Sequence, residues 1–182
     1  MVKDEDQALV RRFLDGDKDA FAELVVRYQR PLYNAAYRVT GNAEDASDVV
    51  QSVFLRVSER LDEYNGNFKF FSWIYRIAVN ESLNLLRRNS RQGRLDDEIE
   101  RPASEQTEPE WRLNEVQQSD RIQRALMSLK VDSRVVLTLR HFSECSYREI
   151  GRILDLDEKT VKSRLFDARQ QLREKLTKGS RG

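Results

Sequence analysis

The sequence predicts an all-α protein made of two small helical domains joined by a flexible acidic linker. Apolar residues recur at helical spacing along most of the 182-residue chain, which is typical of amphipathic helices. Only seven Gly and three Pro are present, too few for a turn-rich β fold. The periodicity is lost in an acidic stretch in the middle of the chain, and this interruption divides the helices into two sets.

Composition excludes several classes of protein. With 35% charged and 39% hydrophobic residues and a net charge of +1, the chain suits helical units with thin cores. No apolar run approaches the ~20 residues of a membrane span, and the acidic N-terminus has no signal-peptide segment. A single cysteine, Cys145, fits a reducing cytoplasm. We interpret Cys145 and His141 as a buried thiol and a surface imidazole, with metal or redox sensing as the alternative, and expect no cofactor.

The first forty residues have the pattern of two helices. A short helix is expected over residues 7–14, and Asp17 or Asp19 can cap the next one. Pro31 should kink or restart this second helix. Gly41 should end it.

A third helix is expected over residues 43–64, with Asn42 as its cap. Its apolar residues share one face and should be buried: Ala46, Val49, Val50, Val53, Phe54, Val57 and Leu61. The opposite face is polar and carries Asp45, Asp48, Ser52, Arg56 and Glu59. These helices are enough to bury one another in a compact bundle.

A helix with two distinct faces is expected from about Ser72 to Arg91. Its apolar face, which should meet the core, consists of Ile74, Ala78 and Leu85, widened by Ile77 and Leu86. Its second stripe combines a ring, two amides and two guanidiniums: Trp73, Asn80, Asn84, Arg87 and Arg91. Rings stack on unpaired bases, amides read base edges and arginines hold phosphate. We therefore expect this helix and the aromatic loop 65–71 to bind single-stranded DNA. The alternative is that the rings belong to the core and that the arginines are solvated.

Residues 95–110 read LDDEIERPASEQTEPE. The segment is acidic, includes Pro102 and Pro109, and lacks sustained apolar periodicity. This composition predicts a flexible linker that is extended by its own charge repulsion. Basic residues lie just before this segment, among them Arg87, Arg88 and Arg91. Positive and negative charge are therefore separated along the chain, although the net charge is small.

The C-terminal part has the spacing of a helix-turn-helix motif. The tetrapeptide 146–149 (SYRE) forms a capping box for a short helix over 147–154. After a turn, Asp157 can cap a second helix that runs to about Leu176. Gly151 falls where the two helices cross and where a side chain would clash.

The second helix of this motif is expected to bury Val161, Leu165, Ala168 and Leu172. It then exposes Lys159, Lys162, Ser163, Phe166, Arg169 and Arg173. A phenyl ring exposed among cations is informative because it can contact a thymine methyl group. Four features agree with one another: the capping box, the length of the turn, the small residue where the helices cross and the cationic face. Together they favour DNA binding over an ordinary helical pair with a charged face.

The motifs of the two halves occur together in one known family. The N-terminal motifs are residues 16–17 (GD), 20–21 (AF), 27–28 (RY), 43–45 (AED), 48–51 (DVVQ) and 68–80 (FKFFSWIYRIAVN). The C-terminal motifs are residues 146–151 (SYREIG) and 160–165 (TVKSRL). In these residues, and over nearly the whole chain apart from the linker, the sequence resembles an extracytoplasmic-function (group 4) sigma factor of the sigma-70 family, similar to sigma-E.

The resemblance implies a sigma-2 domain over residues 5–92, an acidic linker over 93–111 and a sigma-4 domain over 112–178 with its helix-turn-helix at 147–166. It implies a cytoplasmic protein that is not an enzyme and takes no small-molecule substrate. Such a protein binds core RNA polymerase, recognises −10 and −35 promoter elements and initiates transcription of a stress or envelope regulon. An anti-sigma factor would control it and could hold it at the inner membrane.

The resemblance also implies three sets of contact residues. Those for the coiled-coil of the largest polymerase subunit are Asp45, Asp48, Val49, Gln51, Phe54, Arg56 and Leu61. Those for the −10 element are Phe68, Lys69, Trp73, Asn80, Asn84, Arg87, Arg88 and Arg91. Those for the −35 element, on a domain that also meets the polymerase flap, are Lys159, Lys162, Ser163, Arg164, Phe166 and Arg169. The linker would thread the RNA exit channel, with a plain tether as the alternative.

Two positions depart from the family pattern. Ser52 stands where the family commonly has Glu, so one acidic contact to the polymerase is missing or supplied elsewhere. Asp167 stands where a basic residue is common. Its carboxylate could accept from a cytosine amine or pair with Arg164, and we expect it to alter the preferred −35 sequence.

Two rival interpretations remain at this point. A stand-alone helix-turn-helix transcriptional regulator would account for the C-terminal half but leaves residues 68–91 unexplained, and such regulators commonly dimerise. A nucleic-acid enzyme is disfavoured because the sequence has no P-loop, metal cluster or nucleophile–base pair.

Overall fold

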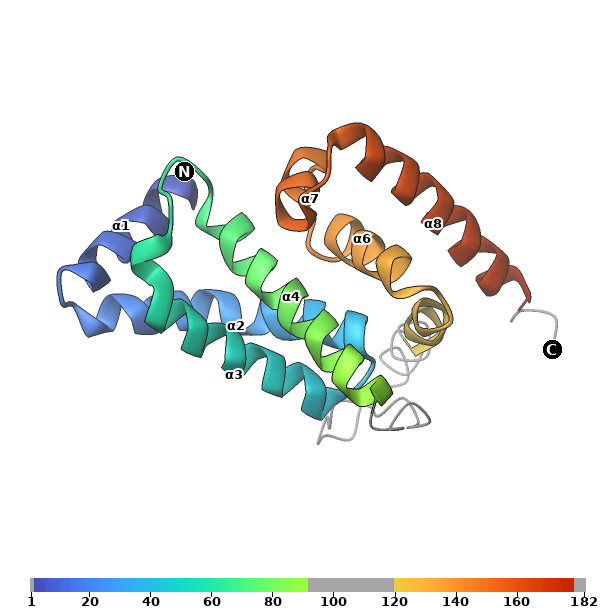
Figure 1. Ribbon diagram of the computed structural model, residues 1–182, viewed down its shortest axis with the longest axis horizontal. Helices are drawn as coiled ribbons and strands as arrows, with labels where there is room; N and C mark the ends of the chain where they lie inside the picture. Colours follow the sequence, from blue (N-terminus) through green and yellow to red (C-terminus); the bar gives the residue numbers. More distant parts are fainter. Residues whose placement is uncertain (1, 92–119, 179–182) are drawn as a thin grey trace, which may run out of the picture.

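The computed structural model describes residues 2–91 and 120–178, and the predicted linker lies outside them. The described residues form helices without a strand, which confirms the predicted fold class. The N-terminal group contains α1 (Val2–Leu14), α2 (Lys18–Thr40), α3 (Ala43–Arg60), the 3₁₀ turn η1 (Leu61–Glu63) and α4 (Phe70–Arg91). The C-terminal group contains a helix over 120–127, α6 (Val131–His141), α7 (Tyr147–Leu154) and α8 (Glu158–Lys178) (Figure 1).

Short polar caps set the bounds of the N-terminal helices. The Asp17 side chain, not that of Asp19, accepts hydrogen bonds at the start of α2. Gly41 ends α2 with φ 82°, a left-handed conformation that glycine adopts without strain. Asn42 then caps α3 by accepting from the Asp45 amide at 2.9 Å. These caps confirm the predicted junction between the second and third helices.

Some predicted bounds were wrong. The predicted restart at Pro31 does not occur, because α2 runs without interruption through this residue, although an interior proline removes a backbone hydrogen bond. Pro31 is itself exposed, whereas Tyr28, Leu32 and Ala35 are buried, so packing holds both halves of α2 on one core. α1 begins at Val2 rather than near residue 7, and α4 begins at Phe70 rather than Ser72.

The core of the N-terminal group lies between α2, α3 and α4, and its fully buried side chains include Leu24, Leu32, Val49, Phe70 and Ile74. α1 is fastened to this core by a buried carboxylate. The Tyr28 hydroxyl donates to Asp6 at 2.6 Å, and Arg27 forms an ion pair with the same carboxylate at 2.6 Å. Burial and this bond raise the pKa of Tyr28, so its hydroxyl remains a donor at neutral pH.

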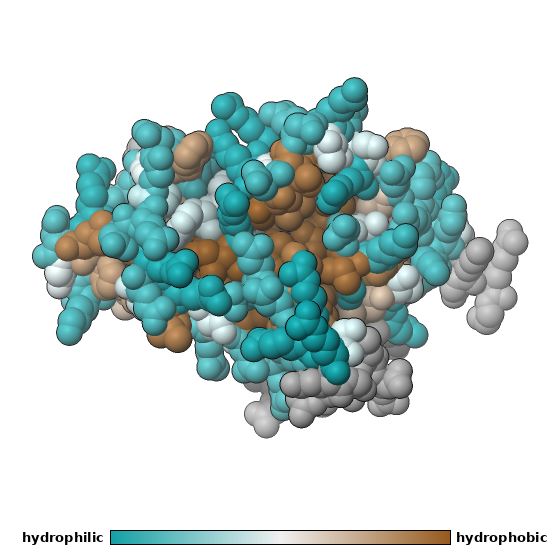
Figure 2. Space-filling view, in the orientation of Figure 1, coloured by the Kyte–Doolittle hydropathy of each residue, from teal (hydrophilic) through white to brown (hydrophobic). Residues whose placement is uncertain are grey.

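The C-terminal group packs directly on the N-terminal group. α6 contacts α2, and α7 contacts α4, so the buried residues of both groups form one continuous hydrophobic cluster. Figure 2 shows hydrophobic residues gathered in the middle of the drawn face, where α4 meets the C-terminal group, with hydrophilic residues around them. Polar contacts also join the two groups of helices. The Gln123 amide donates to the Tyr37 carbonyl at 3.0 Å, and the Arg38 guanidinium lies 4.2 Å from the centre of the Phe142 ring.

Candidate nucleic-acid interface

The loop between η1 and α4, residues 65–69, is held by hydrogen bonds within it and around it. The Asn65 side chain accepts from the Asn67 amide at 2.9 Å, which closes a tight turn. The Tyr64 hydroxyl donates to the Phe68 carbonyl at 2.5 Å, and the Gln7 side chain of α1 donates to the Gly66 carbonyl. The loop predicted to receive an unpaired base therefore has a defined shape.

The aromatic residues of this region divide into exposed and packed rings. Phe68 is 47% exposed. Trp73 is half-buried and packs against Tyr64 and Phe70 with ring centres 5.6 and 5.7 Å away. Phe68 is thus available at the surface, whereas Trp73 belongs to an aromatic cluster.

α4 has the two faces that its sequence predicts. Ile74, Ala78 and Leu85 are buried, with Ile77 and Leu86 half-buried beside them. The exposed residues of the second stripe are Asn80, Asn84, Arg87 and Arg91, and Arg88 is exposed beside them. Amides and guanidiniums therefore follow one open side of the helix, beginning next to the loop.

The helix-turn-helix geometry is present in α7 and α8. Ser146 and Glu149 form both bonds of the capping box at the start of α7, and Asp155 ends α7 with φ 57°. A Cβ atom on Gly151 would lie 2.6 Å from the Leu156 carbonyl oxygen. The glycine thus lets the turn pass close to α7, as predicted, and Asp157 then caps α8 by accepting from the Thr160 amide at 2.7 Å.

The outer face of α8 carries all six side chains that were predicted to contact a −35 element. Val161, Leu165 and Ala168 are fully buried, so the opposite side of the helix is turned outward. The exposed residues there are Lys159, Lys162, Ser163, Arg164, Phe166 and Arg169. Phe166 is 62% exposed, which agrees with the predicted phenyl ring among cations.

Two residues of α6, His141 and Asp132, contact arginines on this face of α8. Arg169 donates to the His141 Nε2 atom at 3.2 Å, and burial together with Arg169 and Arg140 lowers the pKa of His141, which favours the neutral, accepting imidazole. Within the described part of the chain, Arg164 lies 4.0 Å from Asp132 and has no ion pair with Asp167. The Asp167 carboxylate is therefore left on the exposed face.

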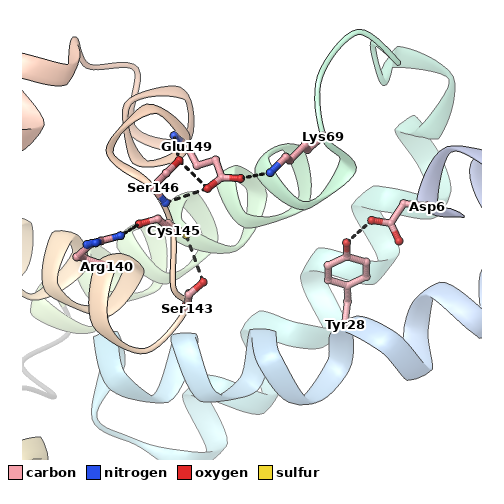
Figure 3. A network of polar contacts seen from close by, with 8 residues as sticks. All are labelled: Asp6, Tyr28, Lys69, Arg140, Ser143, Cys145, Ser146 and Glu149. Carbon is pink, nitrogen blue, oxygen red and sulfur yellow. Dashed lines mark hydrogen bonds and ion pairs between the residues drawn. The ribbon is translucent and has the colours of Figure 1, made fainter. Parts of the chain in front are cut away.

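The loop before α4 is in contact with α7. Lys69 Nζ lies 2.6 Å from the Glu149 carboxylate, which also accepts from the Ser146 amide (Figure 3). Burial would raise the pKa of Glu149, but the bonds from Lys69 and Ser146 hold it below its ordinary value. The Arg152 guanidinium lies 5.2 Å from the centre of the Phe68 ring. Two residues predicted to bind the −10 element thus have partners on the helix-turn-helix.

The polar face of α3 was predicted to bind the polymerase. Asp48, Gln51 and Arg56 are exposed, and Asp45 and Phe54 are half-buried. The Arg56 Nε atom is 3.0 Å from Glu81 of α4, and Asp45 accepts from Asn89 at 3.0 Å. These contacts tie the face of α3 to α4.

Two predicted polymerase contacts need correction. Val49 and Leu61 are 1% and 2% exposed, so their side chains pack in the core and cannot offer surface to a partner. Sequence reasoning also missed Leu55, which is 61% exposed on α3. Leu55 follows Gln51 by four residues and Asp48 by seven, so an apolar side chain at helical spacing on a polar stripe was the available signal.

Cys145 and His141 do not form a site together. Cys145 is 1% exposed, and burial raises the pKa of its thiol to about 12, whereas His141 is bonded to Arg169. Among the described residues, no three His, Cys, Asp or Glu side chains are grouped so that they could hold a metal ion. In the same residues, no helix is both long and apolar enough to span a membrane.

Family models match both groups of helices. The model described as Sigma-70 region 2 matches residues 24–92, and the model described as Sigma-70, region 4 matches residues 119–172. The chain is similar to the ECF RNA polymerase sigma factor SigW of Bacillus subtilis, with 32% identity over 92% of this chain and 94% of that protein. It is 35% identical to the ECF RNA polymerase sigma-E factor of Escherichia coli over 94% of both chains.

Solved structures share the arrangement. CnrH in complex with the cytosolic domain of CnrY matches with a TM-score of 0.73 and 26% identity, covering 95% of this chain and 97% of that one. The sigma factor RpoE of Bartonella quintana, solved with the anti-sigma factor NepR, matches in fold with a TM-score of 0.70 and 21% identity over 86% of this chain and 96% of that one. Because the sequence matches extend over both groups of helices, the chain belongs to the extracytoplasmic-function sigma factors of the sigma-70 family.

Proposed function

We propose that this sigma factor, which is not an enzyme, docks on core RNA polymerase with α3 and reads promoters with α4 and α8. The observation that carries the proposal is the outer face of α8, where six DNA-contact candidates are exposed over a fully buried opposite side. We assign promoter opening to residues 5–92 and −35 recognition to residues 112–178.

α8 acts as a recognition helix in the major groove of the −35 element. Lys159 and Lys162 contribute charge toward phosphate, and the exposed ring of Phe166 suits a thymine methyl group. Arg164 and Arg169 supply guanidiniums for bases or phosphate. Asp167, exposed and without an ion pair to Arg164 among the described residues, is placed to accept from a cytosine amine.

α4 and the loop 65–69 act on the −10 element. Unstacking a base costs a few kcal/mol, which a receiving pocket offsets. The loop supplies that pocket with Phe68 and Lys69 at its rim, while Trp73 borders the opened region. Asn80 and Asn84 read base edges, and the phosphate backbone is held by Arg87, Arg88 and Arg91.

Reading both elements requires the two groups of helices to separate. Lys69 is paired with Glu149, and Phe68 contacts Arg152, so α7 must leave the loop before both side chains are released for contact with DNA. Core polymerase supplies the binding energy for this separation by holding α3 on the coiled-coil of its largest subunit and the C-terminal group on its flap. The linker, residues 93–111, spans the distance between them through the RNA exit channel.

Regulation follows from the same surfaces. CnrH was solved with the cytosolic domain of CnrY, and the Bartonella RpoE with an anti-sigma factor. An anti-sigma factor for this chain would compete with the polymerase for the two groups of helices. The protein would act in the cytoplasm on a stress or envelope regulon and could be held at the inner membrane through that partner.

The test substitutes Asn80→Ala, with Asn34→Ala on the exposed side of α2 as the matched control. With reconstituted holoenzyme, permanganate reactivity of the −10 region should fall about tenfold for Asn80→Ala, in line with the ~1–3 kcal/mol of a base contact. Core polymerase affinity should stay at the control value. Parallel loss of melting and core binding would refute this assignment of α4.

A further inference from the structure

We infer that Tyr64 is a positioning residue that holds the loop 65–69 in the shape that receives an unpaired −10 base. The inference rests on the proposed function of that loop and adds a residue outside the predicted DNA-contact set. Three features of the structure carry it: a fixed ring, a hydroxyl bonded to the loop backbone, and a second tie from α1.

The ring of Tyr64 is fixed by its neighbours. It forms the C-cap of η1, directly before the loop. Its ring meets Phe70 edge to face, with centres 5.5 Å apart and planes at 88°, and lies 5.6 Å from Trp73. Since Phe70 is fully buried, the ring has little freedom to turn, and its hydroxyl has one direction in which to point.

The hydroxyl of Tyr64 points at the backbone of the loop. It donates to the Phe68 carbonyl at 2.5 Å, four residues further along the chain. The Gln7 side chain of α1 donates to a second loop carbonyl, that of Gly66. Burial raises the pKa of Tyr64, so the proton needed for donation is present at neutral pH. Two carbonyls of the loop are thus held by side chains from outside it.

These two hydrogen bonds act on Phe68 and Lys69, the residues proposed to border the base. The side chain of Phe68 is 47% exposed, so its direction depends on its backbone, and that backbone is what Tyr64 holds. Lys69 follows directly. Without the hydroxyl, the loop would have to be ordered when the base enters, and this ordering opposes binding. We expect about a fivefold loss of promoter opening, as for one net hydrogen bond.

If Tyr64 only stabilised the fold, its substitution would have a different effect. Tyr64 also packs in the aromatic cluster, and loss of its ring would destabilise the whole N-terminal group. The Tyr64→Phe variant keeps the ring and removes only the hydroxyl. Tyr33→Phe is the matched control, because Tyr33 stacks on Tyr37 of the same helix and its hydroxyl has no hydrogen bond within residues 2–91 and 120–178.

The experiment uses full-length protein assembled with core polymerase. The probe is a promoter that the wild-type holoenzyme selects from a genomic library, with 2-aminopurine replacing one adenine of its −10 element. Fluorescence reports base unstacking; core affinity and thermal melting are measured in parallel. Tyr64→Phe should open the duplex about fivefold less, with core affinity and melting temperature at the Tyr33→Phe values, and Gln7→Ala should change opening in the same direction.

Three results would overturn the inference. If Tyr64→Phe opens DNA as well as Tyr33→Phe does while Asn80→Ala is defective, Tyr64 does not position the loop and the proposed function stands. If Tyr64→Phe loses core affinity and thermal stability together with opening, its role is structural. If Asn80→Ala also opens DNA normally, the proposed function of α4 itself fails.

Discussion

Cys145 gives the sharpest prediction at the scale of single residues. It lies in the α6–α7 connection, where its side chain is 1% exposed, and burial raises the pKa of its thiol from 9.0 to about 12. Because the folded pKa is raised, this group's contribution to folding is complete below pH 9 and is lost as the pH rises towards 12. At pH 8 the thiolate fraction should therefore be far below that of a free thiol.

Labelling with a disulfide reagent at pH 8 measures this directly. The native chain should react at least a hundredfold more slowly than the urea-unfolded chain, because both burial and the thiolate fraction limit the rate. The unfolded chain serves as the control, since Cys145 is the only cysteine. One thiol per native chain reacting at the unfolded rate would contradict the buried position.

Prediction of single residues from the sequence succeeded where the spacing of apolar residues along a helix decides which side chains are exposed. The six candidates on α8 are exposed because Val161, Leu165 and Ala168 take the buried side, and that alternation is legible in sequence. Assignment by family position was less secure. It placed Val49 and Leu61 at a partner surface although both are core residues. Tyr64 was missed because a hydrogen bond to a backbone carbonyl leaves no pattern in the sequence.

At the scale of elements, the crossing of α7 and α8 depends on Gly151. A Cβ there would lie 2.6 Å from the Leu156 carbonyl oxygen, a backbone atom that cannot move alone. Gly151→Ala should therefore lower the free energy of unfolding by about 1–3 kcal/mol, as for other overpacked sites. In urea denaturation, Gly66→Ala is the control, because its Cβ would have only an ordinary contact at 3.8 Å. Equal stability of the two variants would refute the close approach.

The exposed face of α3 yields a second prediction at this scale. Leu55→Asp places a charge where an apolar side chain, 61% exposed, is expected to meet the polymerase, and burying an unpaired charge in an interface is strongly unfavourable. Core affinity should fall about tenfold or more in a binding titration. Val26→Asp, at a 71% exposed position on α2, should bind normally. Equal affinities would remove α3 from the polymerase interface.

Element boundaries show what local signals can and cannot decide. The caps at Asp17, Asn42 and Ser146 follow from short polar side chains before helices, so the starts of α2, α3 and α7 could be predicted, whereas those of α1 and α4 were misplaced. The restart predicted at Pro31 does not occur because core packing on both sides of the proline outweighs the backbone hydrogen bond that it removes. Propensity is a weak prior when tertiary contacts compete.

At the scale of the whole molecule, the sequence predicts two thin cores and the structure has one continuous cluster. Periodicity identifies the apolar face of each helix but not the helix that covers it. Tyr75 and Val79 of α4 are buried at a seam lined also by Val135 and Leu139 of α6, and only the fold reveals that pairing. The packing also explains why Lys69, a predicted DNA contact, is bound to Glu149.

The central claim is that the two groups of helices must separate before the chain can read a promoter. The most direct measurement joins them with a reducible bis-maleimide bridge between Lys69→Cys and Glu149→Cys, in a Cys145→Ala background. The control bridges Ser133→Cys and Gln171→Cys, two positions in contact within the C-terminal group. With core polymerase, the bridge between groups should abolish run-off transcription until it is reduced, while the control stays active. Full transcription from the bridged chain before reduction would contradict the account.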